Sequence, residues 1–429
     1  MKYILDFVYL LAGIAISPMV IYRMVRRNRY RTGWAQRLGK VSRKEPEKKC
    51  IWIHAVSVGE VNATGTIVKE LQNRFKDFEI VISTTTDTGF ARAKALYGDE
   101  LAVFYFPFDF SLIRKSVLKK LRPAVCLFME LEVWPNFVQI AKELKIPTVV
   151  VNGRITERSC SRYKLIKPIA RKIFANLSLV LAQTEQYAQR FREIGCPDER
   201  VIVTSSLKYD TAQIADKVEA AEQITAGLNI QNNKLWVAGG TGTDEEKILI
   251  DVYKDLQSNN QFADLRLVIV PRKPERFDEV AQLIQQNGFA LIRYSQIKQG
   301  AKAPEHDCQT IILGDTMGDL RKFYSLATII FAGRSLVPMG GSDMIEAAAL
   351  GKCTMFGPHA FNFTQPVNAL LEDDGAILVK DQNELLNAVR KCLTEPDYTQ
   401  RIARNGQNTI KKNQGATKKT IEQIEPFCS

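Results

Sequence analysis

Histidine is scarce in this chain of 429 residues, and cysteine forms no motif. The three histidines are His54, His306 and His359, and none of them pairs at the spacing of metal ligands. We interpret His54, in the middle of an apolar run, as a core imidazole, and we expect no metal site. The eight cysteines include no C-x-x-C pair, which excludes a zinc ribbon or a disulfide framework and is typical of a reducing compartment.

Two catalytic signatures are also missing. The chain has no G-x-S-x-G, the turn that a serine hydrolase of the α/β class needs. It has no G-x-x-x-x-G-K-[ST] either, so an ATP-binding phosphate loop is not expected. No short-period repeat or low-complexity tract occurs. With 45% hydrophobic and 25% charged residues, the composition is that of a globular protein of two or three domains.

Acidic residues are nearly absent from the N-terminal region. The net charge is +12, but residues 1–44 contain ten Lys or Arg and a single acid, Asp6, so they carry +9 of it. The rest of the chain carries only +3. A surface that tracks a phosphate backbone needs basic residues throughout a domain, so we expect no nucleic-acid binding.

The same region contains the longest apolar run, Tyr3–Tyr22. About 20 residues at 1.5 Å each can cross a hydrocarbon core, although Asp6, Gly13 and Pro18 weaken the run as a span. Positive charge after the run predicts a cytoplasmic catalytic body and attraction to anionic lipid, and it does not fit a cleaved signal peptide. A buried N-terminal helix is the alternative, and a span and an interfacial helix both stay open. The flanking arginines are Arg23, Arg26, Arg27, Arg29 and Arg31.

Short β-branched runs alternate with amphipathic segments along the chain, which predicts α/β domains with buried parallel sheets. Residues 209–232 are polar and lack a strand signal, so we interpret them as a linker between two doubly wound domains. Ligands of such domains bind at the carboxyl ends of the strands, across a cleft. The predicted strands are 50–56, 79–84, 101–107, 124–130, 148–153, 177–184 and 200–205 in the first domain, and 234–241, 265–271, 289–295, 310–316, 328–333, 352–357 and 375–379 in the second.

Polar side chains follow several of these strands. In the stretch IWIHAVSVGEVNATG, Glu60 stands where a strand turns into a helix. It is either a favourable charge at a helix N-terminus or a catalytic base at the mouth of a cleft. In MELEVWPN, Glu130 and Glu132 follow another buried strand, and two acids there favour a functional site. Lys208 ends the first domain, where a lysine is usually solvated.

The second domain has four glycine-containing or basic strand ends. AGGTGTDEE is a glycine-rich turn, and Arg272 in VPRKPERF can bind a phosphate with its guanidinium. LGDTMGDL provides a third turn. In FAGRSLVPMGGSDMIEAAALGK, two glycines precede a helix that starts at Ser342-Asp343 and contains Glu346. A helix start favours a phosphate, and an acid one turn later can accept from a ribose hydroxyl.

These motifs resemble, in order and over nearly the whole chain, those of the 3-deoxy-D-manno-octulosonic acid (Kdo) transferases of lipopolysaccharide core biosynthesis. The motifs are HAVSVGE, STTTDTGF, FPFDF, MELEVWPN, VNGRI, VPRKPERF, GDTMGDL and GGSDMIEAAALGK…FGPHAFNF. The resemblance implies a GT-B fold of two Rossmann-like domains. It implies a first domain that binds the lipid A precursor, a second domain that binds CMP-Kdo, and transfer with inversion and without a metal or cofactor.

Residue by residue, the resemblance implies that Glu60 is the proton acceptor and that Glu130 and Lys208 stabilise the transition state. It assigns CMP binding to Pro271, Arg272, Met317, Gly318, Asp319, Asp343, Met344, Ile345 and Glu346. The sequence departs from the family where Ser342-Asp343 replace His-Asn and Met344-Ile345 replace Pro-Leu. Gly240 and Gly242 also stand where Ser and His are usual, so side-chain contacts at these positions are not carried over.

The resulting expectation is an anchor and basic flank at 1–31, an acceptor domain at 32–208, a linker at 209–232 and a donor domain at 233–429. The enzyme is expected on the cytoplasmic face of the inner membrane, with CMP-Kdo, the tetra-acylated lipid A precursor and anionic inner-membrane lipid as partners. Two alternatives are another GT-B enzyme, such as a UDP-sugar transferase or epimerase, and an inactive membrane-tethered scaffold.

Overall fold

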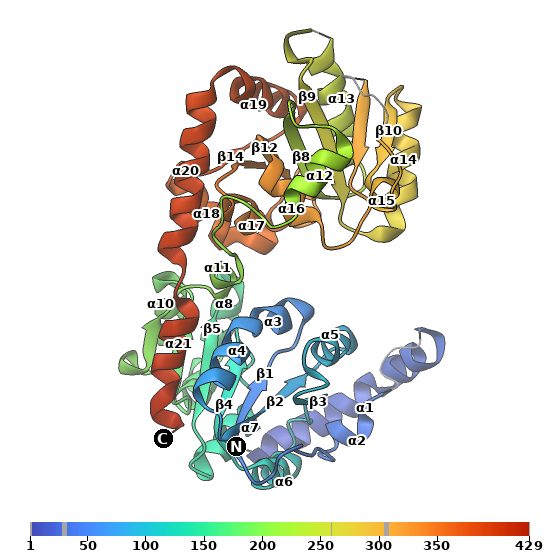
Figure 1. The fold of residues 1–429 in the computed structure, drawn as a ribbon. Helices are drawn as coiled ribbons and strands as arrows, with labels where there is room; N and C mark the ends of the chain where they lie inside the picture. Colours follow the sequence, from blue (N-terminus) through green and yellow to red (C-terminus); the bar gives the residue numbers. More distant parts are fainter. Residues whose placement is uncertain (1, 28–31, 259, 304–308, 429) are drawn as a thin grey trace. The chain divides into compact units, whose positions relative to one another are not determined.

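The computed structural model describes residues 2–27, 32–258, 260–303 and 309–428. The chain divides into two compact units, and each contains one sheet (Figure 1). Unit 1 comprises Met1–Thr211 and Gln414–Ser429, and unit 2 comprises Ala212–Asn413. His306, Cys308, Arg29 and Arg31 lie outside the described residues.

Unit 1 is built on a seven-stranded sheet of order β3-β2-β1-β4-β5-β6-β7, in which all neighbouring strands are parallel. Every strand predicted for this half of the chain is present. The strands are β1 (Lys49–His54), β2 (Phe78–Thr84), β3 (Ala102–Tyr105), β4 (Pro123–Met129), β5 (Thr148–Gly153), β6 (Leu179–Ala182) and β7 (Val201–Val203).

Helices follow most strands of unit 1. They are α1 (Lys2–Arg27), α2 (Trp34–Arg37), α3 (Val58–Ala63), α4 (Gly65–Arg74), α5 (Asp87–Tyr97), α6 (Ser111–Leu121), α7 (Pro135–Glu143), α8 (Glu157–Leu165), α9 (Lys167–Phe174), α10 (Glu185–Glu193), η1 (Asp198–Arg200), α11 (Leu207–Thr211), α21 (Ala416–Ile424) and η5 (Glu425–Phe427). Thr86, Thr156 and Thr184 accept from the main-chain N–H three residues on, so they cap α5, α8 and α10.

Unit 2 is built on a second seven-stranded parallel sheet, of order β10-β11-β9-β8-β12-β13-β14. All seven strands predicted for this half are present as well. They are β8 (Lys234–Thr241), β9 (Leu265–Pro271), β10 (Ala290–Arg293), β11 (Thr310–Leu313), β12 (Ile329–Ala332), β13 (Cys353–Phe356) and β14 (Ile377–Leu378).

The helices of unit 2 are α12 (Ala221–Leu228), α13 (Glu245–Gln257), η2 (Asn260–Phe262), η3 (Pro274–Arg276), α14 (Phe277–Gln286), α15 (Tyr294–Lys298), α16 (Leu320–Leu326), α17 (Met344–Ala349), η4 (Phe361–Phe363), α18 (Thr364–Glu372), α19 (Gln382–Thr394) and α20 (Pro396–Asn413).

Each sheet is covered on both faces, which is why its strands are apolar at nearly every position. In β1, Ile51 and Ile53 belong to one buried cluster and Trp52 to another, so the alternation of side chains supplies two cores from one strand. Each such apolar side chain contributes about 1.5–3 kcal/mol when fully buried. Trp52 is aligned by a hydrogen bond of 2.8 Å from Nε1 to Ser83 Oγ.

His54 is a core residue, as its place in a strand predicts. Its ring stacks on Phe106 with centroids 3.6 Å apart, and Nδ1 lies 3.0 Å from Ser83 Oγ. Burial lowers the pKa of His54 to about 3, so the imidazole is neutral at physiological pH.

The structure divides the chain at different residues from those the sequence indicates. Residues 209–232 are not an open linker, because they contain α12, whose Ile224 and Leu228 are buried in the core of unit 2. The C-terminal end also changes unit: α21 packs against α4, and Ile421 and Ile424 are buried in the core of unit 1. The segment that contains α12 has many polar residues and few large apolar ones, so the sequence pattern does not reveal this helix. The pattern of α21 does not show in which of the two domains that helix packs.

Helix α1 is long and apolar enough to cross a membrane by length and composition, with a mean hydropathy of 2.1 over its most apolar window. It is not a buried core helix, because none of that window is buried. Its first turns contact α6 and α7 of unit 1.

Candidate active site

Each sheet has one point at which the strand order reverses. In unit 1 the chain steps outward from β1 to β3 and then returns to place β4 beside β1. Loops at the carboxyl ends of such neighbouring strands diverge and leave a crevice where ligands of doubly wound folds bind. Glu60 follows β1 and Glu130 follows β4, so the structure brings these two predicted residues to the same crevice.

Glu60 is both a helix cap and a half-buried acid. It is the third residue of α3, and its Oε2 accepts from Val56 N at 2.9 Å. Ser57 Oγ accepts from Glu60 N at 3.4 Å, and Glu60 Oε1 accepts from Ser57 N at 3.3 Å. Ser57 Oγ also lies 2.8 Å from Glu60 Oε1. This reciprocal pair is a capping box, which orders the first turn of α3. The two interpretations of Glu60 are therefore compatible, since the cap fixes the carboxylate in place.

Three carboxylates act on one another at this crevice. Burial raises the pKa of Glu60, and the charge of Glu130 raises it further, although the Val56 N–H offsets part of the rise. Burial also raises the pKa of Glu132 to about 7, with contributions from Glu60 and Glu130 and an opposing hydrogen bond from Trp134. Acids held close together away from water hold a proton more tightly than ordinary carboxylates, and such shifts are typical of catalytic sites. The MELE motif alone does not reveal that the pKa of Glu132 is raised.

Glu130 has an unusual backbone. Its φ is +56°, in the left-handed region that costs a non-glycine residue about 1 kcal/mol or more. Its N–H still donates to Val151 O at 3.0 Å, so it extends the β4–β5 pairing by one bond before the chain turns. The turn continues into Trp134, whose Nε1 donates to Glu132 Oε2 at 3.2 Å.

Lys208 lies on the short helix α11, which contacts both α3 and α21. The start of α11 is fixed by the buried Asn152 at the end of β5, whose Oδ1 accepts from Leu207 N at 3.1 Å. Asn152 itself has a φ of +56°. The VNGRI motif therefore positions the lysine helix against the helix that contains Glu60.

In unit 2 the strand order reverses between β8 and β12. The chain after β12 leads to α17, whose N-cap is Asp343, with Oδ1 accepting from Ile345 N at 2.9 Å. One turn on, Glu346 is half-buried with Arg321 Nη1 at 3.7 Å. Burial raises the pKa of Glu346, Asp343 raises it further, and Arg321 opposes the rise.

Several predicted donor residues gather around one buried phenol. Burial strongly raises the pKa of Tyr324, and Glu346, Asp343 and Arg272 all act on it electrostatically. Arg272 is exposed and follows the buried Pro271 at the end of β9. The exposed guanidinium and the Glu346 carboxylate therefore lie at one edge of the second sheet.

The remaining donor residues differ in what they can present to a ligand. Met317 is 68% exposed, and Gly318, with a φ of +89°, has open space where a side chain would be. Met344 and Ile345 are fully buried, so only their main chain can reach a ligand. The carboxylate of Asp319 is buried and is held by Lys298 Nζ at 2.7 Å and Lys322 Nζ at 3.0 Å.

The main-chain N–H groups that follow β12 do not form an open anion site. Glu245 at the start of α13 reaches across and accepts from the N–H groups of Arg334, Ser335 and Leu336. A cluster of N–H groups of this kind attracts an anion, and here a buried carboxylate of the protein satisfies it.

Two of the departures from the family pattern are coupled in space. Ser342 Oγ donates to Gly240 O at 2.6 Å, and a Cβ at Gly240 would lie 2.5 Å from that hydroxyl oxygen. A Cβ at Gly242 would lie 2.5 Å from Met339 Sδ. Glycine is favoured at Gly240 by its φ of +66° and by the Ser342 side chain, whereas a side chain at Gly242 would only have to displace the flexible end of Met339.

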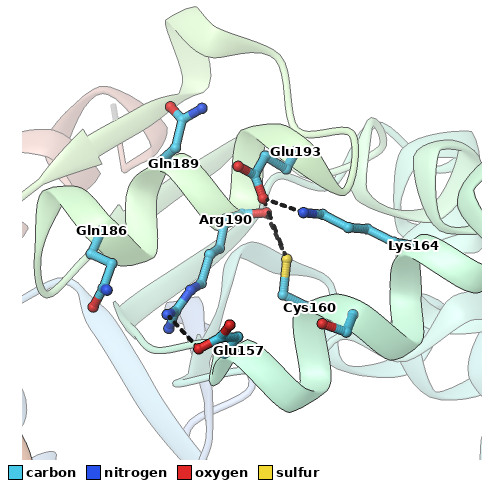
Figure 2. Close-up of a pocket in the computed structure, with 8 residues that line it drawn as sticks. Glu157, Cys160, Lys164, Gln186, Gln189, Arg190 and Glu193 are labelled. Carbon is cyan, nitrogen blue, oxygen red and sulfur yellow. Dashed lines mark hydrogen bonds and ion pairs between the residues drawn. The ribbon is translucent and has the colours of Figure 1, made fainter.

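A hollow of about 370 Å³ lies in unit 1 between α8 and α10 (Figure 2). Its charges are paired with one another: Lys164 Nζ lies 2.8 Å from Glu193 Oε2, and Arg190 Nη2 lies 4.0 Å from Glu157 Oε2. Cys160 Sγ is 3.7 Å from the same Glu193 oxygen. The hollow contains none of the predicted site residues.

The chain is similar to known proteins over most of its length. Residues 32–211 match the family of 3-deoxy-D-manno-octulosonic-acid transferases. The chain is 32% identical over 405 residues to the 3-deoxy-D-manno-octulosonic acid transferase of Haemophilus influenzae, covering 94% of this chain and 93% of that protein. It is 29% identical over 433 residues to the transferase of the same name from Bordetella pertussis, covering 98% and 99%.

Among solved structures, a glycosyltransferase from Rickettsia africae aligns with a TM-score of 0.58 over 89% of this chain and 98% of that one. At 14% identity, this likeness is one of fold, and it identifies the two Rossmann-like units as those of a GT-B protein. The sequence relatives carry the assignment further, because they cover both units at up to 32% identity. The chain belongs to the 3-deoxy-D-manno-octulosonic acid transferase family and is a glycosyltransferase.

Proposed function

We propose that this enzyme transfers Kdo from CMP-Kdo to the tetra-acylated lipid A precursor, with inversion and with Glu60 as the general base. The observation that carries the proposal is the group of three interacting carboxylates where β1 meets β4. Burial and mutual repulsion raise the pKa values of Glu60 and Glu132, which makes them better proton acceptors than ordinary carboxylates.

The attacking group is a sugar hydroxyl of the acceptor, which is a weak nucleophile until its proton is removed. Glu60 takes that proton as the hydroxyl oxygen forms a bond to the anomeric carbon of Kdo. The bond from that carbon to the phosphate oxygen breaks, and CMP leaves with the electron pair. A single displacement inverts the anomeric carbon, and it needs one base rather than the second, nucleophilic carboxylate of a retaining enzyme.

The capping box prepares Glu60 for this step. Oε1 accepts from both the N–H and the hydroxyl of Ser57, whereas Oε2, among the described residues, accepts only from Val56 N, so Oε2 keeps a further lone pair that can receive a proton. Fixing the carboxylate before the substrate arrives avoids the cost of ordering it during the reaction. Glu130 and Lys208 are proposed to stabilise the transition state from the neighbouring β4 turn and α11.

CMP is proposed to bind in unit 2. The exposed Arg272 can neutralise the phosphate of the departing CMP, which carries more charge after the bond has broken. Glu346 can accept hydrogen bonds from the ribose. Met317, Gly318 and Asp319, together with Asp343, Met344 and Ile345, contribute largely through the main chain because three of these side chains are buried.

The lipid acceptor implies a place at the membrane. We propose that α1 and the arginines at 23–31 hold the enzyme on the cytoplasmic face of the inner membrane, in contact with anionic lipid. Twelve large apolar side chains of α1 are exposed, from Tyr3 to Val25, and lipid is a favourable environment for such a surface.

The direct test is mass spectrometry of the product formed from CMP-Kdo and the tetra-acylated precursor. The proposal predicts a precursor extended by Kdo and the release of CMP. Parallel calorimetry should detect binding of CMP and much weaker binding of UDP. Tight UDP binding with no Kdo product would favour a UDP-sugar enzyme instead.

A further inference from the structure

Helix α1 combines an exposed apolar surface with an acid in its second turn. Its exposed apolar side chains run along its whole length, and from Leu10 to Met19 every residue is exposed. Asp6 is costly in the core of a bilayer, where a carboxylate has no water and few partners. The contacts of Asp6 therefore bear on whether α1 crosses the membrane or lies along it.

Asp6 is bound to the body of unit 1. Its Oδ1 accepts from Ser111 N and from Asn136 Nδ2, both at 2.8 Å, and its Oδ2 accepts from Ser111 Oγ. One turn later, Tyr9 Oη donates to Asp109 Oδ2 at 3.2 Å. These hydrogen bonds join the start of α1 to the N-terminal ends of α6 and α7, and we name them the α1 latch.

The latch ends in the interior of the domain rather than on a loose loop. Asp109 is buried, and it accepts from Arg114 Nε, Asn136 N and Phe137 N, all at 3.0 Å. The guanidinium of Arg114 lies 3.9 Å from the centre of the Phe106 ring. The FPFDF motif thus builds a fixed acceptor for Tyr9, and an additional ion pair of 2.9 Å joins Lys2 to Glu143 on α7.

The chain after α1 returns to the same body. Gly33 lies against the ring of Tyr105, which occupies the space that a side chain at Gly33 would need. Trp34 packs on Phe108 with centroids 6.0 Å apart, and Phe108 N donates to Arg37 O at 2.8 Å. The start of α1 and the chain from Gly33 onward are therefore both held by unit 1. A helix that crosses a bilayer places its ends about 30 Å apart on opposite sides of the hydrocarbon.

We propose that α1 does not span the membrane but lies within the cytoplasmic leaflet, with its N-terminus on the cytoplasmic side, held in this orientation by the α1 latch. The proposal rests on the membrane association proposed above, and it commits to anionic lipid as the occupant of the exposed surface. The apolar side chains meet acyl chains, and the half-buried Arg23 and the exposed Arg26 lie where headgroups carry negative charge.

The half-buried residues of α1 agree with this orientation. They are Lys2, Leu5, Asp6, Tyr9, Val20, Arg23 and Met24. At 100° per residue these positions fall on one side of the helix, so the first turns and the last turns of α1 turn the same side away from solvent. The opposite side carries the large apolar residues that remain exposed.

The side of the membrane on which the N-terminus lies can be read with an epitope tag placed before Met1 of the full-length chain. Protease is added to intact spheroplasts and, separately, to inverted membrane vesicles. The tag should survive in spheroplasts and be removed in inverted vesicles. Loss of the tag in intact spheroplasts would place the N-terminus in the periplasm and overturn the proposal. Recovery of the enzyme in the soluble fraction would instead contradict the membrane association itself.

The latch can be tested by oxidative cross-linking in native membranes. A chain with Asp6→Cys and Ser111→Cys should form a disulfide within the chain, because the two side chains are in contact. The matched control pairs Ile14→Cys, which is 61% exposed, with Ser111→Cys, and it should not form one. Absence of the first cross-link, or equal formation of both, would overturn the latch. A disulfide between two chains through Ile14→Cys would show that a second copy covers the helix and would overturn lipid as its occupant.

Discussion

The two sheets have similar reversal points but treat their acids in opposite ways. In unit 1, Glu60 and Glu132 are half-buried, and burial together with the charge of Glu130 raises the pKa of both. In unit 2, the fully buried acids near the strand ends are matched by donors, although burial and Asp343 still raise the pKa of the half-buried Glu346. Glu246 pairs with Arg276 Nη1 at 2.6 Å, and Asp319 is bound by two lysines and has a lowered pKa because their hydrogen bonds outweigh burial.

The difference teaches what each site is suited to do. Acids that repel one another are good proton acceptors, so the edge of unit 1 is suited to removing a proton from a hydroxyl. Acids that are already neutralised leave the exposed Arg272 to attract an anion, so the edge of unit 2 is suited to a nucleotide phosphate. The same fold thus provides a basic site for chemistry in one unit and an anion-binding site in the other.

The largest expected effect is the loss of transfer in Glu60→Gln. Removing the general base should lower kcat by about 10²–10⁴-fold, since this is the typical contribution of a positioned base. Glutamine can keep the capping box, because its amide oxygen can still accept from the Ser57 N–H. The midpoint of thermal unfolding and the affinity for CMP should therefore stay close to those of the unmodified enzyme.

Glu60→Ala is the matched control, because it removes both the base and the cap. It should lose activity like the glutamine variant and also lose stability, by about 0.5–2 kcal/mol. Near-normal turnover in Glu60→Gln, together with reduced stability in Glu60→Ala, would show that Glu60 only caps α3. The acids of unit 1 would then have no catalytic role to distinguish them from the acids of unit 2.

The second effect concerns the donor edge. Arg272→Ala and Glu346→Ala should each weaken CMP binding by about 10- to 100-fold, which corresponds to the 1.5–3 kcal/mol of a hydrogen bond to a charged group. Calorimetry with CMP measures this directly. Lys273→Ala is the control, because Lys273 is an exposed neighbour whose Nζ lies 3.9 Å from Glu275. Unchanged CMP affinity in both donor variants would place the nucleotide elsewhere.

Sequence patterns predicted the sheets well because parallel strands are marked by unbroken apolar runs. All fourteen strands lie where β-branched runs occur, and Glu60 and Glu130 meet because both follow strands that are neighbours at the reversal point. The unit that receives α21 was not predictable. Its placement depends on Asp210, whose Oδ1 accepts from Gly415 N at 2.7 Å, a contact over about 200 residues that no local pattern indicates.

The chemistry within the site was predictable only in part. The MELE motif suggested two acids, but the pKa of about 7 for Glu132 depends on burial and on Glu60, which is distant in sequence. The motifs also did not distinguish side chains that can contact a ligand from side chains that pack in the core. Met344 and Ile345 lie in a predicted nucleotide segment, yet their side chains belong to the core. The FPFDF motif, which is one of the motifs shared with the family, holds α1 through Asp109.

A third effect is a pH-dependent stability. Folding raises the pKa of Glu132 from 4.5 to about 7, so the folded enzyme holds this proton more tightly than the unfolded chain. The stabilisation is fully present below pH 4.5 and is lost as the pH rises to 7. Glu132→Gln should therefore match the unmodified enzyme at pH 4.5 and exceed it at pH 8 by about 2 kcal/mol, below the full shift because the side chain is partly exposed. Chemical denaturation at the two pH values measures the difference, and equal gains at both would contradict the raised pKa.

The smallest effect is expected from removing α1, because neither edge includes it. A chain that starts at Gly33 loses the hydrogen bonds of Asp6 to Ser111 and Asn136 but keeps α2, so its free energy of unfolding should fall by only about 1–3 kcal/mol. A chain that starts at Val41 is the control, since it also loses Arg37, whose guanidinium lies 4.4 Å from the centre of the Tyr105 ring.

Transfer to a detergent-dispersed acceptor should change by no more than about twofold in the chain that starts at Gly33, because a twofold change corresponds to only ~0.4 kcal/mol in the barrier. On vesicles that contain anionic lipid the same chain should be much slower. It has lost the apolar surface of α1 and five arginines, each worth about 1 kcal/mol near such a surface. Raising the salt concentration should slow the full-length enzyme and leave the shortened one nearly unchanged, because only the former depends on that attraction. Equal rates of the two chains on anionic vesicles at physiological salt would show that α1 is not a membrane anchor. A large loss of activity in detergent would show instead that α1 is needed to position the carboxylates of unit 1. Residues at the strand edges of units 1 and 2 would then not be sufficient for catalysis.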